Sequence, residues 1–349
     1  MKSSIKKLKN CRHVVEVKLS PERIKGEFDK VYDSLKKAAN VPGFRVGTAP
    51  RDLLEKHYNK TAYEEVIKKL VPETYKAIVE QYKLDPIGYP DITDLKLDMD
   101  GGFSYTASIE IRPEFSLKNY KGLKLKKKNT EVKGEDVQKN LETLRDAHAQ
   151  KVPKEGSEEK EKVLPKLDDE FAKDLGFDSL IKLKDAVKTD LQHRLEHESQ
   201  ADLEVQVVNQ LVDSVNFDIP DSLVSSEKDR LLKDAKNRIA YIEAIQKKQN
   251  PEKKFELSDK DKKELEENSQ KQAVRQVKAF FILDKIAQIE KIQIKSEELD
   301  REIENMATQY QKSKKEIEDY LARNHLLDEM AVNMRNKKVM DFILKEDVL

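Results

Sequence analysis

Along the first 128 residues, segments with the two-residue hydrophobic period of a strand occur together with segments that have the 3.6-residue period of a helix. Residues 13–19 alternate apolar and polar side chains, as a half-buried strand does, and so do residues 94–98, 103–111 and 122–128. Asp100-Gly101-Gly102 predicts a tight hairpin turn between the second and third of these segments. The pattern therefore predicts a small sheet in this part of the chain.

Two helical segments separate the first strand from the later ones. Ser20 and Pro21 predict a helix start, because a hydroxyl can cap the first turn and proline is tolerated at its first position. Pro50 opens a short helix over residues 51–58, and a longer one follows over about 61–82, where Pro72 predicts a kink. Helices grouped between one strand and a later group of strands indicate an α+β domain over residues 1–128.

From Gly134 the hydrophobic period is helical almost to the end of the chain. Predicted helices cover residues 134–150, 180–215, 220–248, 258–290, 296–311, 313–323 and 326–346. A helix and a charged, turn-rich linker fill residues 129–163, and an all-α domain follows over 164–349. Several of the helices have narrow apolar stripes, so we expect an elongated domain whose arms leave partly apolar surface between them.

Composition agrees with long, solvated helices. Of the 349 residues, 38% are charged and 37% hydrophobic, with no Trp. The 67 basic and 67 acidic residues cancel overall, but residues 1–58 contain 14 Lys and Arg against 7 Asp and Glu, a local charge of +7. A basic end on an acidic remainder is compatible with one end of the protein contacting RNA.

Cysteine content and hydropathy point to a reducing, aqueous compartment. Cys11 is the only cysteine, so an internal disulfide cannot form. No stretch approaches the roughly 20 apolar residues that span a bilayer, and the first residues lack the apolar core of a signal peptide. We expect a cytoplasmic protein with no membrane partner.

The motifs of common enzyme classes are missing. The chain has no GxxxxGK[ST], GxGxxG or HExxH motif, so we expect no nucleotide, metal or other cofactor. His193 and His197 would share a helix face, but no third ligand accompanies them, and surface histidines are the better interpretation. Cys11 stands alone, and the lysines of 126–128 and 312–315 are interpreted as solvated faces.

One loop does not fit a purely structural interpretation. Residues 41–50, VPGFRVGTAP, place Phe44 and Arg45 at the tip of a turn-rich connection between two helices. In one interpretation Phe44 is packed into the domain core. In the other, Phe44 is an exposed apolar plug, and Arg45 beside it forms two-pronged bonds to phosphate or carboxylate. An aromatic residue beside an arginine is typical of an interface anchor.

The loop and several longer segments resemble one known family. Gly43-Phe44-Arg45-Val46-Gly47, followed by Pro50, is similar to the signature loop of the trigger factor family of bacterial chaperones. Further similar segments occur in the same order along nearly the whole chain, at residues 84–92, 103–117, 164–177 and 331–344.

The resemblance implies the protein's partners. The N-terminal domain would bind the large ribosomal subunit beside the exit tunnel, through a tunnel-exit protein and ribosomal RNA. Gly43, Phe44, Arg45, Val46, Gly47 and Pro50 would form the contact. The helical domain would cradle unfolded and nascent polypeptides without ATP. A homodimer off the ribosome is left open.

This sequence departs from the family pattern in two ways. The family's FKBP-like proline isomerase domain would lie between Gln150 and Leu164, where about 13 residues without an aromatic side chain stand, and a domain needs at least about 50. Isomerase activity is therefore not expected. Many members also have a basic residue after the loop arginine, where this chain has Val46.

Two other functions remain as alternatives. One is a ribosome-independent holdase of the SurA kind, which the lack of an export signal disfavours. The other is a proline isomerase with an unrecognised site among the helices, which a peptide isomerisation assay would reveal. A coiled-coil scaffold is disfavoured because no heptad pattern is sustained.

Overall fold

A computed structural model describes residues 1–118, 120–153, 160–249 and 258–347. Its internal contacts divide the chain into two compact units, which are described separately. The first unit combines Met1–Ser116 with Asn216–Phe281, and the second combines Leu117–Val215 with Ile282–Leu349.

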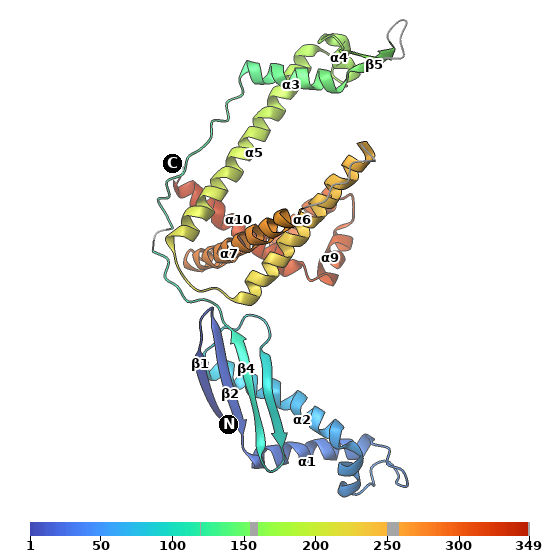
Figure 1. Cartoon of the computed structure of the whole chain (residues 1–349), viewed down its shortest axis with the longest axis vertical. Coiled ribbons are helices and arrows are strands. Elements are labelled where there is room, and N and C mark those ends of the chain that lie inside the picture. Colours follow the sequence, from blue (N-terminus) through green and yellow to red (C-terminus); the bar gives the residue numbers. More distant parts are fainter. Residues whose placement is uncertain (119, 154–159, 250–257, 348–349) are drawn as a thin grey trace. The chain divides into compact units, whose positions relative to one another are not determined.

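A four-stranded antiparallel sheet forms the N-terminal part of the first unit (Figure 1). Its strands are β1 (Lys2–Lys7), β2 (Arg12–Leu19), β3 (Asp91–Asp98) and β4 (Gly102–Glu110). They lie in the order β1-β2-β4-β3, so the first hairpin and the later one meet through the pairing of β2 with β4. β1 was not expected, because its sequence KSSIKK offers one apolar residue to a period-two pattern.

Helices α1 (Pro21–Ala38) and α2 (Arg51–Tyr82) supply the apolar side chains that cover one face of the sheet. Alternate residues of β2 and β4 face these helices, since side chains in a strand point to opposite sides in turn. The shared core includes Val15, Val17, Phe28, Tyr32, Leu54, Leu70, Phe103, Tyr105 and Ile109. Burial of this one core fixes both helices, and therefore both ends of the loop that joins them.

The two predicted helices of residues 51–82 form one element with an internal break. Tyr58 has non-helical torsions, φ −121° and ψ 18°, and is the residue at which the helical geometry of α2 is interrupted. Pro72 lies within the helix, so the chain is not interrupted there, and the expected kink at Pro72 stays a prediction. Leu70 and Thr74, on either side of Pro72, are buried in the core, and their packing keeps this part of the chain helical.

Two long helices complete the first unit. They are α6 (Asp221–Gln249) and the larger part of α7 (Asp259–Ile289). Phe115, after the last strand, stacks on Phe217 with ring centroids 4.1 Å apart, and both belong to a cluster with Val277 and Phe281 of α7. Glu110 at the end of β4 also pairs with Arg12 and accepts a hydrogen bond from the Ser222 hydroxyl of α6. The sheet domain thus shares a small core with this helix pair.

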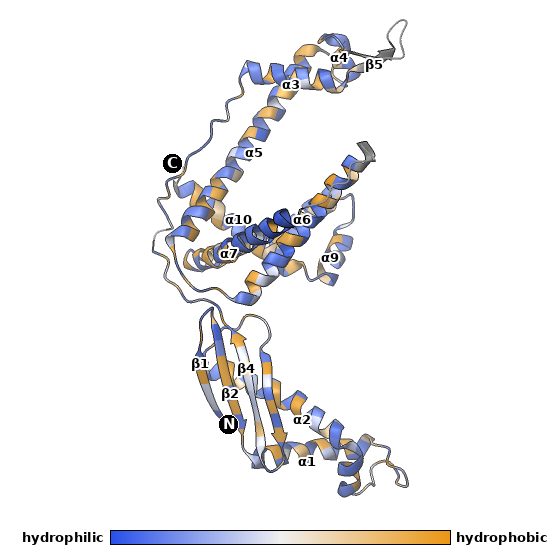
Figure 2. Cartoon of the chain, viewed as in Figure 1, coloured by the Kyte–Doolittle hydropathy of each residue, from blue (hydrophilic) through white to orange (hydrophobic). Residues whose placement is uncertain are grey.

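The second unit is almost entirely helical. It contains α3 (Gly134–Ala147), α4 (Asp169–Asp174), α5 (Leu180–Ser214), the end of α7, α8 (Ser296–Gln309), α9 (Lys314–Arg323) and α10 (Leu327–Asp347). Hydrophilic and hydrophobic residues alternate along α5 and α6 (Figure 2), as expected for helices that bury one face only. The α+β N-terminal region and the mostly helical remainder confirm the expected fold class, whereas the arms stay a prediction.

Two stretches between the N-terminal sheet and α5 differ from expectation. Within the predicted linker, Gln150–Pro153 (β5) and Lys160–Val163 (β6) pair as a small antiparallel sheet, and residues 154–159 lie outside the described part of the chain. Residues 122–128, predicted as a strand from their alternation, have no strand partner. They form an extended strap along α5.

Glutamine side chains take the place of a neighbouring strand for this strap. Gln206 accepts a hydrogen bond from Lys126 N at 2.9 Å and donates one to Lys126 O at 2.9 Å. Gln210 makes the same pair with Lys124, at 3.2 and 2.9 Å. Four residues of helix rise about 6.0 Å and two of extended chain about 6.6 Å, so the two spacings match. The alternating pattern of residues 122–128 thus marks an extended segment, but amide side chains and not a neighbouring strand form its backbone hydrogen bonds.

We predict that changing Gln206 and Gln210 together to Ala loosens the strap without unfolding the unit. Two pairs of hydrogen bonds are lost, each bond contributing about 0.5–1.5 kcal/mol. Trypsin should cut the lysines of residues 124–128 several times faster than in the parent, as measured by mass spectrometry of a limited digest. Gln192→Ala with Gln200→Ala is the matched control, since these glutamines bond to Glu196 and Glu204 within α5. Equal cleavage rates in both double variants would contradict the prediction.

A buried carboxylate connects the two helices of the N-terminal core. Glu27 of α1 is only 1% exposed, and its oxygens lie 2.8 Å from Lys30 Nζ and 2.6 Å from Lys69 Nζ of α2. The hydrogen bond from Lys30, followed by the one from Lys69, lowers the pKa of Glu27. The ionised form is therefore favoured in the folded state.

We predict that Glu27→Gln destabilises the protein by about 1–2 kcal/mol at pH 7. A lowered folded pKa means that the stabilisation is present above the unfolded pKa of about 4.3 and is lost as pH falls through the folded value. The difference from the parent should therefore shrink on going from pH 7 to pH 3, as followed by urea unfolding. Glu16→Gln, at an exposed position of β2, should show no such difference at either pH.

Candidate functional site

The loop at residues 41–50 is fixed at both ends by small buried side chains. Val41 is 2% exposed and Ala49 is 4% exposed, and both belong to the core shared by the sheet, α1 and α2. All seven residues between them are exposed. The loop is therefore anchored at its base, with its tip in solvent.

Two successive turns shape the tip, and a glycine makes each of them possible. Phe44 N donates to Val41 O at 3.1 Å, closing a turn with Pro42 and Gly43 in its centre. Thr48 N donates to Arg45 O at 3.0 Å and closes the second turn around Val46 and Gly47. Gly43 and Gly47 have φ of +85° and +90°, which is the requirement of a type II turn at its third residue.

The turns leave an aromatic ring, a cation and an aliphatic side chain exposed side by side. Phe44 is 40% exposed and Val46 is 54% exposed, so the interpretation in which Phe44 packs into the core is excluded. Arg45 is exposed too, and no ion pair of the described residues involves it. Its guanidinium is thus available to an external anion. Gly43, Gly47 and Pro50 shape and end the loop rather than presenting a side chain.

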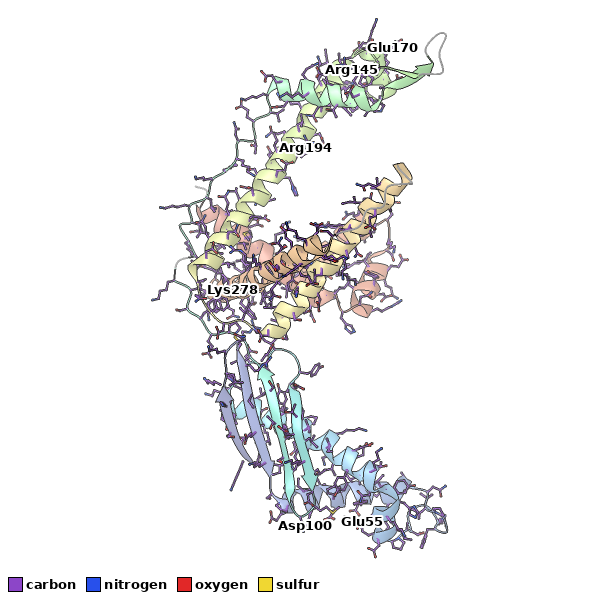
Figure 3. The ribbon with its side chains drawn as sticks, viewed as in Figure 1. Glu55, Asp100, Arg145, Glu170, Arg194 and Lys278 are labelled. Carbon is purple, nitrogen blue, oxygen red and sulfur yellow. The ribbon has the colours of Figure 1, made fainter. Side chains whose placement is uncertain are left out.

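The first turn of α2 ties the exit of the loop to α1. Arg51 Nη2 lies 2.9 Å from Asp29 Oδ1, Arg51 Nε donates to Glu55 Oε1 at 2.7 Å, and the guanidinium carbon lies 4.4 Å from the Tyr32 ring centroid. Glu55 is labelled in Figure 3, on the part of α2 that follows the loop. Pro50 precedes the helix, and its carbonyl accepts from Leu53 N and Leu54 N.

The entrance of the loop is held from the break in α2. Tyr58 Oη donates to Asn40 O at 2.9 Å, and its ring packs against the N-terminal core. Nothing in the pattern of residues selected Tyr58, Val41 or Ala49 as part of the site. The only available signal was that Val41 and Ala49 bracket the turn residues as small apolar side chains.

The other candidates do not assemble into a site. Cys11 Sγ donates to Asp218 O at 3.1 Å, and burial, followed by the nearby Asp218 charge, raises the pKa of its thiol to about 11. The thiolate, the reactive form, is therefore scarce at neutral pH. His193 and His197 are exposed on α5, and the described residues contain no group of three side chains arranged to hold a metal. Within these residues, no helix is long and apolar enough to cross a membrane.

Comparison with known proteins gives the family. The family model of the bacterial trigger factor protein (TF) matches residues 1–144, and the model of its C-terminus matches residues 179–345. The trigger factor of Anoxybacillus flavithermus is 25% identical over 99% of this chain and 99% of its own length. That of Bacillus subtilis is 25% identical over 95% of this chain and 96% of its own.

A solved structure shows the same fold. It is described as "Promiscuous Substrate Recognition in Folding and Assembly Activities of the Trigger Factor Chaperone", and it matches with a TM-score of 0.59 at 20% identity. The match covers 99% of this chain and 100% of that one. The fold that the two share combines a small α/β region with a helical remainder. The chain belongs to the trigger factor family.

The middle isomerase region of the family is missing from this chain. Residues 145–178 lie between the two family matches. The alignment with the Anoxybacillus relative has 430 positions, whereas this chain has 349 residues, so the relative has at least 81 residues without a counterpart. In their place stand the short strands β5 and β6 and the helix α4.

We predict that Gly43→Ala and Gly47→Ala each destabilise the protein by about 1 kcal/mol. A Cβ at either position would meet nothing within 4 Å, so the effect comes from the positive φ and not from a clash. Gly26→Ala is the matched control, because Gly26 lies inside α1 with equally open space, and alanine should stabilise that helix by about 0.5–1 kcal/mol. Urea unfolding of the three variants measures both signs, and a stabilising effect at Gly43 or Gly47 would contradict the turn geometry.

Proposed function

We propose that this protein is an ATP-independent chaperone that docks beside the exit tunnel of the large ribosomal subunit through the loop at residues 41–50. There it shields emerging polypeptides from aggregation until they fold. The observation that carries the proposal is a loop with buried ends and an exposed Phe44, Arg45 and Val46 at its tip. Exposing an aromatic ring to water on a constrained loop costs a modest amount of free energy. That cost is recovered when a partner buries the ring.

The charge around the loop supports an anionic partner. The last turn of α1, just before the loop, carries Lys36 and Lys37, both exposed. Residues 1–58 as a whole have a charge of +7. Such a field steers association with a negatively charged surface such as ribosomal RNA, and salt should weaken the association. At the tip, Arg45 would bond to phosphate or carboxylate while Phe44 fills an apolar pocket.

Val46 changes the balance of this contact. Where many family members add a second cation, this chain adds an apolar side chain that is 54% exposed. We infer that its docking depends more on apolar burial and less on counterion release. The binding should therefore weaken less steeply with salt than binding through two adjacent cations would.

The helical part would hold clients by weak, scattered apolar contacts. Large apolar side chains are exposed on the long helices at separated places, including Ile181 and Val205 of α5 and Tyr241 of α6, at 72%, 58% and 69%. Each buries little area, at roughly 25 cal/mol per Å², and association costs oppose the sum. Binding near micromolar, about −8 kcal/mol, would retain an unfolded segment and still release it without nucleotide.

The proposal assigns a role to each part of the chain. Residues 1–128 dock on the ribosome, residues 129–163 connect, and residues 164–349 bind clients in the cytoplasm. We expect no enzymatic activity, and proline isomerisation of a test peptide should proceed at the uncatalysed rate. Dimerisation off the ribosome is compatible with this scheme but is not required by it.

We predict that changing Phe44 and Arg45 together to Ala abolishes co-sedimentation with purified ribosomes. Interface anchors of these types contribute about 2 kcal/mol or more each, which corresponds to a loss of at least 30-fold in affinity for either one. Suppression of aggregation of a denatured test protein should stay close to the parent, because the loop lies outside the helical region.

Tyr320→Ala with Arg323→Ala is the matched control. It removes an exposed aromatic residue and an exposed arginine from α9 and should leave ribosome pelleting unchanged. If the Phe44 and Arg45 variant pelleted with ribosomes as well as the parent, the proposed docking role would be wrong.

A further inference from the structure

The break in α2 lies at Tyr58, whose hydroxyl reaches the entrance of the loop at residues 41–50, the proposed docking loop. Tyr58 leaves helical geometry at φ −121° and ψ 18°, and its hydroxyl donates to Asn40 O at 2.9 Å. Its ring remains packed against the core that holds α1 and α2. The eighth residue of a 32-residue helical element has non-helical torsions, and its hydroxyl bonds to the backbone 18 residues earlier.

Asn40 is the point at which such a bond has most effect. It lies between Ala39, whose N–H donates to Leu35 O at the end of α1, and Val41, whose carbonyl closes the first turn of the loop. The bond from Tyr58 therefore fixes the peptide that leads from a buried helix end into the turn carrying Phe44.

The hydrogen bonds at the tip of the loop are local. Within residues 42–48, every hydrogen bond of the described structure joins two residues of the loop itself or its anchor Val41. No hydrogen bond of the described residues ties the tip to the rest of the protein, so the hydrogen bonds at the base contribute to the direction in which Phe44 and Arg45 project. Arg51 secures the exit side through Asp29 and Tyr32, and Tyr58 secures the entrance side.

We propose that Tyr58 is a positioning residue for ribosome docking, and that the break in α2 exists to bring its hydroxyl to Asn40. This inference rests on the proposed function of the loop. Tyr58 itself does not contact the ribosome. It restricts the free protein to the loop orientation that binds, so that less conformational entropy is lost on docking.

The test replaces Tyr58 by Phe in the full chain, which removes the hydroxyl and keeps the ring. Ribosome affinity is measured by a pelleting titration with purified ribosomes, and loop order by hydrogen exchange of peptides that cover residues 41–50, read by mass spectrometry. We expect ribosome binding to weaken about 3- to 10-fold, the equivalent of one hydrogen bond, and the loop amides to exchange faster.

Tyr82→Phe is the matched control on the same helix. Tyr82 Oη donates to Ser3 O at 3.0 Å, so this change also removes a tyrosine bond to a distant carbonyl, but far along α2 from the loop. It should leave ribosome affinity and loop exchange at the parent level. If Tyr58→Phe lowered the unfolding temperature clearly more than Tyr82→Phe does while ribosome affinity and loop exchange stayed at the parent level, the role of Tyr58 would be structural only and the proposal would be overturned.

The outcomes separate this inference from the proposed function. If Phe44→Ala abolishes ribosome binding while Tyr58→Phe binds as tightly as the parent, docking stands and the positioning role is wrong. If Phe44→Ala has no effect on ribosome binding, the proposed function fails. The exchange measurement then decides by itself whether Tyr58 orders the loop, since unchanged exchange overturns that role and faster exchange supports it.

Discussion

Burial of Val41 and Ala49 in one core is the constraint on which the candidate site depends. These two side chains connect the ends of an exposed loop to the same apolar layer that joins α1, α2 and the sheet. Because both anchors lie in a single core, any movement of one loop end relative to the other would open that core. The positions of the Phe44 ring and the Arg45 guanidinium are then restricted by the loop ends, so that less conformational entropy is lost on binding.

Side chains of the long helices hold irregular backbone segments in place by hydrogen bonds at two positions of the chain. Gln206 and Gln210 satisfy both the N–H and the carbonyl of alternate strap residues, as a neighbouring strand would. Tyr58 satisfies the carbonyl of Asn40. In each case a side chain from a long helix supplies the hydrogen bond that an irregular segment lacks, and exposed backbone that would otherwise bond to water is held in place.

The chain belongs to the trigger factor family but lacks the middle isomerase region of that family. The two family matches leave residues 145–178 between them, and this stretch forms β5, β6 and α4 next to a small core that includes Leu141, Phe171 and Leu183. The buried side chains of Leu141, Phe171 and Leu183 join α3, α4 and α5 in this core.

The sequence alone determined the helices, most of the sheet and the turn residues of the loop, because each depends on local spacing. The 3.6-residue period predicted α5 to α10 within a few residues of their observed ends, and Gly43 and Gly47 marked the turns. Tertiary structure decided the rest. Whether Phe44 is buried or exposed depends on the packing of the whole domain, which buries Val41 and Ala49 and leaves Phe44 40% exposed. The partner of residues 122–128 is supplied by glutamines about 80 residues away, and Tyr58, at the break in α2, bonds to the carbonyl of Asn40 in the segment after α1. Such contacts join positions distant in the chain, so no local period could reveal them.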